Sequence, residues 1–304
     1  MKVRCQMIRG KITDAVKSGR ILVSDGAWGT MLQNKGLTTA ECPDEWSVSH
    51  FDIVTEIAKD YLDAGADMVE TNSFGATAIK LEHYGLSDRA AEINEWAARA
   101  SRQAAGDDRW VIGSVGPTGK MLLMEEITEE ELYEAFKTQA VALQAGGADA
   151  VCIETMSDIE EAVIAIQAAK ENTDLEIICT FTFDRTVRGD YRTMMGVSPT
   201  AAAAAAVQAG ADMIGTNCGN GMERMKDIVA EMRKAFPEVP ILVHANAGLP
   251  VNEDGKVVFP QTPEEMAALT PDVIRAGAGI VGGCCGTTPE HINAIKYAIM
   301  NIGR

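Results

Sequence analysis

The chain has 304 residues, a length that suits one large barrel domain or two ordinary domains. Its composition, 46% hydrophobic and 23% charged, is that of a water-soluble protein with a sizeable core. The net charge of −17 and the lack of a Lys/Arg-rich run exclude nucleic acid and anionic membrane surfaces as natural partners.

The first residues, 1–19, lack the apolar run of a signal peptide, and no apolar stretch reaches the roughly 18 residues that span a bilayer. The cysteines number seven and have no regular spacing, which argues against a disulfide scaffold. We therefore expect a cytoplasmic protein with reduced thiols and no membrane contact.

Eight short apolar runs recur along the chain, with helical patterns between them. Four of them repeat one sequence pattern, in which small residues at the end of a helix precede an apolar run that ends in polar residues. This order is typical of a buried parallel strand whose C-terminal end carries function. In chain order, the predicted strands lie within 21–27, 64–75, 110–116, 146–157, 176–183, 209–221, 240–247 and 276–287.

Start signals for helices stand between these strands. Three pairs have the spacing of a capping box, namely Thr128–Glu131, Ser157–Glu160 and Thr262–Glu265. Prolines suited to a first helical position stand at 199, 263 and 289.

This alternation, without a linker rich in Pro, Gly or Ser, predicts a single-domain (β/α)₈ TIM barrel over residues 1–304. Residues 1–20 are expected as an N-terminal helical extension. An open, doubly wound sheet is the alternative, but SDGAWGTML at 24–32 lacks the Gly-rich loop that such a sheet would carry after its first strand.

Three cysteines stand at strand ends that a barrel would bring to one mouth. Cys218 ends the predicted sixth strand, and Cys284 and Cys285 end the eighth. Only one strand separates the sixth strand from the eighth, so the axes of these two strands are roughly 10 Å apart. A loop can close this gap. Three converging thiolates suit Zn²⁺ with a fourth coordination position left open.

Other interpretations of the cysteine pair remain open. A Cys₂His site would use His244, but this residue precedes its strand end by two positions and is expected deeper, in an ordinary buried hydrogen bond. A phosphate site would use the glycines and Thr287–Thr288 at the start of the last helix. A redox-active vicinal disulfide would use the pair alone.

A zinc ion with three cysteinates favours activation of a thiol over activation of water, because its ligands already supply electron density. Alkylation of a substrate thiolate is then the natural reaction. Asp25 and Glu154, both at strand ends, could hold an ammonium group, and backbone amides in 25–30 could hold a carboxylate. These features describe an amino acid that carries a thiol, and they leave the role of Glu70 undecided.

Six segments of the chain resemble signature segments of the homocysteine S-methyltransferase family. In chain order they are DGAWGTML, ETNSFGA, IETMSD, GTNCGNG, NAGLP and GGCCGTTPEHI. The double-cysteine segment is specific, the others are moderately so, and together they extend over nearly the whole chain. The likeness is strongest to the homocysteine-binding part of cobalamin-dependent methionine synthase.

The resemblance implies a (β/α)₈ barrel that binds homocysteine and zinc. The zinc ligands of the family fall on Cys218, Cys284 and Cys285. Its acidic contacts to the homocysteine amino group fall on Asp25 and Glu154. Its carboxylate-binding loop falls on Gly26 and Ala27.

Two positions depart from the family's pattern. Trp28 replaces a smaller or more flexible apolar residue, and His244 replaces a less polar one. The chain also has no D-x-H-x-x-G segment, a motif that binds corrinoids.

We therefore expect a zinc-dependent enzyme of methionine biosynthesis that transfers a methyl group to homocysteine. The expected donor is a methyl-corrinoid (cobalamin) carried by a partner protein. The same site with another thiol acceptor, or with S-methylmethionine, betaine or methyl-folate as donor, is the first alternative. A barrel lyase or aldolase with a phosphate site after strand eight is the second, and no predicted strand ends in the lysine that Schiff-base chemistry needs. A zinc storage protein is disfavoured by the open coordination position.

Overall fold

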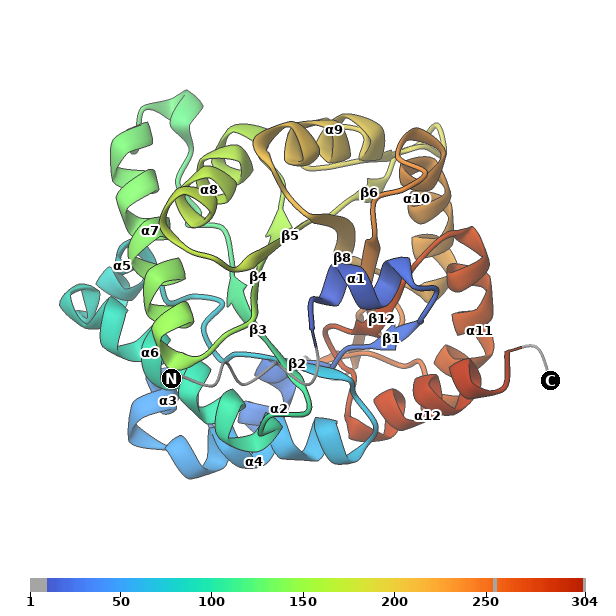
Figure 1. Cartoon of the computed structure of the whole chain (residues 1–304), viewed down its shortest axis with the longest axis horizontal. Helices are drawn as coiled ribbons and strands as arrows, with labels where there is room; N and C mark the ends of the chain where they lie inside the picture. Colours follow the sequence, from blue (N-terminus) through green and yellow to red (C-terminus); the bar gives the residue numbers. More distant parts are fainter. Residues whose placement is uncertain (1–9, 254–255, 303–304) are drawn as a thin grey trace, which may run out of the picture.

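Eight parallel strands form a barrel that a ring of helices surrounds (Figure 1). The structure, a computed structural model, describes residues 10–253 and 256–302. Around the barrel the strands follow the order β1-β12-β9-β8-β5-β4-β3-β2, which confirms the predicted (β/α)₈ fold. The strands are β1 (Leu22–Val23), β2 (Met68–Glu70), β3 (Trp110–Val115), β4 (Ala150–Met156), β5 (Glu176–Phe181), β8 (Met213–Gly221), β9 (Ile241–Asn246) and β12 (Ile280–Gly283).

The outer helices contact one another in chain order, and the last of them contacts the first, so that the ring closes. None of the helices in the described part of the chain is long and apolar enough to cross a membrane. The ring consists of α4 (Phe51–Asp63), α6 (Ala90–Ala105), α7 (Glu129–Gly146), α8 (Ile159–Asn172), α9 (Pro199–Ala209), α10 (Met222–Ala235), α11 (Pro263–Ala276) and α12 (Pro289–Met300).

Shorter elements occupy the connections. Two hairpins extend from the loops after β5 and β9, and short helices fill the loops near the start of the chain and after β2 and β3. They are α1 (Ile12–Lys17), α2 (Trp28–Asn34), α3 (Trp46–Ser49), α5 (Ala78–Leu81), the 3₁₀ helices η1 (Glu82–Tyr84), η2 (Ser87–Arg89) and η3 (Leu122–Met124), and the paired strands β6 (Asp184–Arg185) with β7 (Tyr191–Arg192) and β10 (Val251–Glu253) with β11 (Lys256–Val258).

The predicted helix starts are confirmed in all but one case. Thr128 and Thr262 form capping boxes, and the three prolines lie in the first turns of α9, α11 and α12. The Ser157–Glu160 capping box is wrong, because α8 begins one residue later than that pair requires. Its N-cap is Asp158, whose Oδ1 accepts a hydrogen bond from the amide of Glu160 at 2.8 Å.

The strands divide the apolar side chains between two layers. In β4, Ala150 and Cys152 point into the barrel, whereas Val151 and Ile153 pack against the helices. This alternation follows from the two-residue period of a strand. Because both faces of the strands are buried, they appear in the sequence as unbroken apolar runs.

Helix α1 closes the N-terminal end of the barrel. Ile12 and Ala15 join the interior apolar cluster, which includes the first residues of several strands, such as Met68. The carboxylate of Glu176 accepts hydrogen bonds from the amides of Ile12 and Thr13, the first residues of this helix. Residues 1–9 of the expected N-terminal extension lie outside the described residues.

The barrel closes between β1 and β2 largely through side-chain contacts. A single backbone hydrogen bond, from the Asp67 amide to the Val23 carbonyl at 2.7 Å, joins them. The Asp67 carboxylate also accepts from the Val23 amide at 2.9 Å and from the ammonium group of Lys296 at 2.9 Å. Asp67 therefore ties both first strands to the last helix.

Replacing this carboxylate should weaken the seam measurably. We expect Asp67→Asn to lower the free energy of unfolding by about 1.5–3 kcal/mol, since it removes charge-assisted hydrogen bonds from a nearly buried group. Urea denaturation followed by circular dichroism measures this. The matched control is Asp63→Asn, which removes the partner of Lys59 in an exposed ion pair. It should cost about 0.5 kcal/mol or less, and equal losses in the two variants would contradict the role of Asp67.

Candidate active site

A cavity of about 660 Å³ opens where the C-terminal ends of the strands meet. Cys218, Cys284 and Cys285 lie on its wall, and Glu154 lies there too. The turn before α2 adds two residues expected from the sequence, Gly26 and Ala27. Asp25 lies behind the wall, because it is fully buried and does not line the cavity.

The three cysteines that the sequence singled out lie together. Their sulfur atoms are all within 4.8 Å of one another, and the Sγ atoms of Cys218 and Cys285 are 3.8 Å apart. Hydrogen bonds from the Cys284 and Cys285 thiols lower the pKa of Cys218 to about 3. The same contact with Cys218 raises the pKa of Cys284 well above its usual range.

A turn after β12 lets the two neighbouring cysteines face the same point. The strand ends at Gly283, and the amide of Cys284 still donates to the carbonyl of Ala245 on β9 at 2.7 Å. The backbone then turns through Gly286, which has a left-handed φ of 80°. A Cβ at this glycine would lie 2.3 Å from a side-chain carbon of Phe259, so the turn requires glycine.

The third cysteine reaches the cluster through irregular backbone. Cys218 has a φ of 58° and lies where β8 shifts its register against β9. Thr155 has a φ of 61° and lies at a similar shift between β4 and β5. Left-handed backbone costs a non-glycine residue free energy and gathers at functional sites, and a bulge re-aims the side chains around it.

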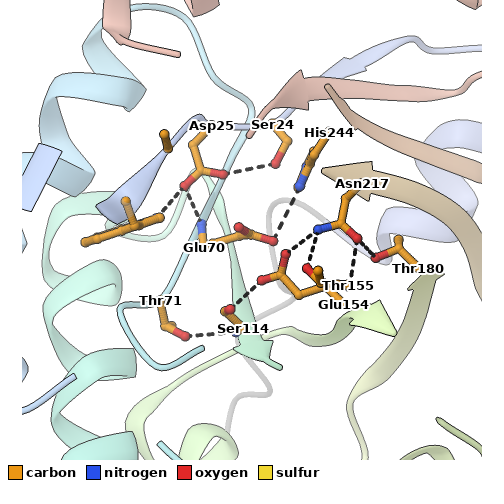
Figure 2. A network of polar contacts seen from close by, with 12 residues as sticks. Ser24, Asp25, Glu70, Thr71, Ser114, Glu154, Thr155, Thr180, Asn217 and His244 are labelled. Carbon is orange, nitrogen blue, oxygen red and sulfur yellow. Dashed lines mark hydrogen bonds and ion pairs between the residues drawn. The ribbon is translucent and has the colours of Figure 1, made fainter. Parts of the chain in front are cut away.

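Asn217 holds these two irregular segments together (Figure 2). Its amide nitrogen donates to Glu154 Oε2 at 2.9 Å and to Thr155 Oγ1 at 2.7 Å. Its Oδ1 accepts from the Thr155 amide at 2.8 Å and from the Thr180 hydroxyl at 2.7 Å. The side chain that precedes Cys218 therefore fixes the carboxylate of Glu154.

The two carboxylates predicted from the sequence differ in their surroundings. Glu154 is 6% exposed, and its Oε1 accepts from the hydroxyl of Ser114. Asp25 accepts from three donors: the Glu70 amide at 2.8 Å, the indole nitrogen of Trp28 at 2.9 Å and the hydroxyl of Ser24 at 3.2 Å. Trp28, a departure from the family's pattern, is thus a partner of Asp25.

Glu70 and His244 lie beside Glu154, as Figure 2 shows. His244 Nδ1 is 3.6 Å from Glu70 Oε1. His244 is buried, as expected, but its Nε2 has no hydrogen-bond partner among the described residues, nor does Oε1 of Glu70. Nε2 therefore does not make the expected hydrogen bond of a core histidine, and Nδ1 has the contact with Glu70 instead. His244 groups with carboxylates, whereas the cysteines form a separate group of possible metal ligands.

Burial dominates the electrostatics of this site. It raises the pKa of Asp25 to about 6 and that of Glu154 to about 7. Burial also raises the pKa of Glu70 well above its usual range, with the negative charge of Glu154 as the second cause. Burial lowers the pKa of His244 to about 4, so that its imidazole is neutral near pH 7.

The loop after β12 uses its threonine internally. The hydroxyl of Thr287 donates to the carbonyl of Cys284 at 2.7 Å and accepts from the amide of Ala27 at 3.0 Å. Thr287 is fully buried. The hydroxyl of Thr287 is therefore satisfied within the protein, which disfavours its use by a phosphate. Cys284 and Cys285 are free thiols.

Sequence reasoning left two residues of the site without a role. Asn217 stood at the end of a predicted strand, directly before a candidate metal ligand, and that position was the available signal. Ser114 carried no signal, because a serine inside an apolar strand is common. Its contact with Glu154 depends on the pairing of β3 with β4.

Comparisons with known proteins agree with this geometry. The family model described as homocysteine S-methyltransferase matches residues 22–299. Methionine synthase of Mycobacterium tuberculosis is 32% identical over 308 residues, which covers 95% of this chain and 25% of that protein. Methionine synthase of Mycobacterium leprae is 32% identical over 299 residues, which covers 92% and 24%. The chain thus spans about a quarter of the length of these relatives.

Solved structures share the fold. The homocysteine methyltransferase MmuM of Escherichia coli, in its metallated form, has a TM-score of 0.74 and 22% identity, covering 91% of this chain and 96% of that one. The carboxyl transferase domain of Rhizobium etli pyruvate carboxylase has a TM-score of 0.57 and 15% identity, covering 95% and 48%. At these identities the likeness concerns the barrel alone.

Fold and site together define a barrel enzyme with a cluster of three thiols at its mouth. The chain belongs to the homocysteine S-methyltransferase family.

The raised pKa of Glu154 has a consequence for stability. Since its folded pKa, about 7, exceeds the reference value of 4.5, its contribution is present below the reference value and lost as the pH rises through 7. From pH 5 to pH 8 the wild-type protein should lose roughly 2–3 kcal/mol of unfolding free energy through this group, and Glu154→Gln should not show this loss. Urea denaturation at both pH values measures it. Glu264→Gln, at an exposed position, should lose as much unfolding free energy from pH 5 to pH 8 as the wild type. An equal loss in Glu154→Gln would refute the raised pKa of Glu154.

Proposed function

We propose that the protein transfers a methyl group to the sulfur of homocysteine, bound at zinc, and so produces methionine. The observation that carries this proposal is the convergence of Cys218, Cys284 and Cys285 on the cavity wall, in a chain of the homocysteine S-methyltransferase family. The buried carboxylates beside them supply the negative charge that an amino acid's ammonium group needs.

The donor set fits zinc. Three sulfur ligands on one side of an ion leave the side that faces the cavity open, as in a catalytic zinc site. Zinc bound there would lower the pKa of a substrate thiol while leaving its sulfur electron-rich. Cys218, Cys284 and Cys285 would hold the ion, and the bends in the backbone at Cys218 and Gly286 direct these thiols to one point.

The remaining residues would bind the amino acid part of the acceptor. Glu154 on the cavity wall and Asp25 behind it would provide negative charge for its ammonium group, and the Gly26–Ala27 turn at the start of α2 would contact its carboxylate. Both ends of the substrate would then be fixed while its sulfur faces the cysteines. This geometry favours an α-amino acid over a simple thiol as acceptor.

The proposed donor is a methyl-corrinoid on a separate protein. Two relatives that match most of this chain are methionine synthases, which supports a methyl-corrinoid as donor. A free donor such as S-methylmethionine, betaine or methyl-folate is the alternative within the same chemistry. A cavity of about 660 Å³ leaves room for a donor above an amino acid.

The activity test uses zinc-loaded protein and L-homocysteine with methylcobalamin, S-methylmethionine, betaine or methyl-folate in separate reactions. We expect methionine with methylcobalamin, detected by mass spectrometry. Methionine from another donor would replace the corrinoid part of the proposal. No methionine from any of the four would overturn the proposed function.

The zinc site makes a separate prediction. The purified protein should bind zinc, and Cys218→Ser, Cys284→Ser and Cys285→Ser should each lose it, because two thiolates hold zinc far more weakly than three. Elemental analysis after dialysis measures the metal content. Cys179→Ala, a change of a buried thiol outside the cluster, should keep the zinc. Full zinc content in Cys218→Ser would disprove the three-thiolate site.

The two carboxylates lead to a further prediction. Asp25→Asn and Glu154→Gln should weaken homocysteine binding about tenfold to a hundredfold, the loss expected when a charge-assisted contact is removed. Both variants should keep their zinc, because neither residue is a ligand. Calorimetry with the zinc-loaded protein gives the affinity. Unchanged affinity in both variants would return these residues to a structural role.

A further inference from the structure

Two turns of the chain are bonded to each other at the mouth of the barrel. The α2 turn, residues 25–30, leads from β1 into α2, and the cysteine turn, residues 283–287, leads from β12 toward α12. Three hydrogen bonds run between them, each from a backbone amide: from Gly283 to the Asp25 carbonyl at 2.8 Å, from Ala27 to Thr287 Oγ1 at 3.0 Å, and from Gly286 to Thr30 Oγ1 at 3.3 Å.

Thr287 bonds to both turns. Its hydroxyl accepts from the amide of Ala27 and donates to the carbonyl of Cys284 at 2.7 Å. The same carbonyl also accepts from the amide of Thr287 at 3.1 Å, which closes a four-residue turn that contains Cys284 and Cys285. One threonine therefore closes the cysteine turn and attaches it to the α2 turn.

Tyr61 of α4 supports this contact from the helix ring. Its side chain is fully buried, and its hydroxyl is 3.0 Å from the carbonyl oxygen of Ala27 and 3.3 Å from that of Thr287. Burial raises the pKa of Tyr61 well above its usual range, so the hydroxyl keeps the proton that it donates. One hydroxyl group is thus shared between carbonyls of the two turns.

The two turns pack closely around Thr287. A Cβ at Gly26 would lie 2.7 Å from Thr287 Oγ1 and 2.9 Å from a ring carbon of Tyr61. A Cβ at Gly283 would lie 2.3 Å from Thr287 Oγ1. Glycine at both positions is therefore what allows the backbones to approach this hydroxyl.

We propose that Thr287 and Tyr61 are positioning residues that hold the cysteine turn and the α2 turn together as one unit. This inference rests on the proposed function, in which the cysteine turn carries two zinc ligands and the α2 turn contacts the carboxylate of the acceptor. Neither Thr287 nor Tyr61 lines the cavity, so both act through the backbone of other residues. Because the Thr287 hydroxyl bonds to both turns, its removal should weaken zinc binding and acceptor binding together.

The test removes or keeps one hydroxyl group in the full chain. Thr287→Val should weaken zinc binding about tenfold to a hundredfold, the loss typical for a partner of a metal ligand. At saturating zinc it should also weaken L-homocysteine binding roughly twofold to tenfold, as expected for one lost neutral hydrogen bond. Thr287→Ser, which retains the hydroxyl, should retain most of both affinities. Competition with a chelator gives the zinc affinity, and calorimetry gives that of L-homocysteine.

Tyr61→Phe gives an independent check, because it removes only the hydroxyl that the two turns share. It should weaken zinc and L-homocysteine in the same direction as Thr287→Val. In the double variant the losses should be smaller than the product of the single ones, since both hydroxyls act on the same contact. Fully multiplicative losses would show that Tyr61 acts separately and overturn its part of the proposal.

Thr270→Val is the matched control. Thr270 is also fully buried, but its hydroxyl bonds to the Met266 carbonyl of its own helix, α11, at 3.0 Å. This variant should leave both affinities unchanged. Equal losses in Thr270→Val and Thr287→Val would reduce the effect to general destabilisation and overturn the proposal. A loss of zinc affinity alone in Thr287→Val, with L-homocysteine binding intact at saturating zinc, would also overturn the joint role.

Hydrogen exchange of the zinc-free protein tests the contact without metal, substrate or activity. Thr287→Val should speed amide exchange in residues 25–30 and 283–287 together, because each turn loses a partner in the other. Thr287→Ser and Thr270→Val should not. Unchanged exchange in either segment of Thr287→Val would contradict the unit. Failure of the proposed function has a different signature, the lack of methionine with any donor, and it does not alter the exchange result.

Discussion

The whole site depends on how the barrel closes between its first two strands. One backbone hydrogen bond, from Asp67 just before β2 to Val23 on β1, joins these strands, and the carboxylates of Asp67 and Asp25 add side-chain contacts at the two ends of this seam. Glu70, on β2, lines the same cavity as Cys284 and Cys285, which follow β12. These aspartate side chains take the place of part of the backbone hydrogen bonding between the two strands. The stability of the barrel and the geometry of its mouth therefore depend on the same carboxylates.

The mouth concentrates carboxyl groups that, among the described residues, form no ion pair with a lysine or arginine. Asp25, Glu70 and Glu154 are nearly or fully buried, and burial raises the pKa of each of them. A core designed for stability alone would pair or remove these groups. Their persistence beside a cavity agrees with a site that gains its missing charge from a ligand, so that binding energy is directed to a cationic substrate.

The thiol cluster depends on backbone that deviates from regular strands. Cys218 and Thr155 adopt left-handed conformations, and the four hydrogen bonds of Asn217 hold the segments around both residues. The strain is therefore balanced by one fully buried amide side chain. The same side chain bonds to Glu154, so the thiol cluster and the carboxylate that faces the cavity form one connected unit.

The sequence by itself determined the barrel, because buried parallel strands leave apolar runs, and small-residue helix ends repeat before them. It also determined the three cysteines, since residues at strand ends of a barrel meet at one mouth. Helix starts followed from local spacing, except at α8, where Asp158 competed as the cap. Only the tertiary structure decided the partners of Glu70, His244, Ser114 and Asn217. Their contacts join different strands, and hydrogen-bond geometry between strands depends on register and bulges, which no local pattern encodes.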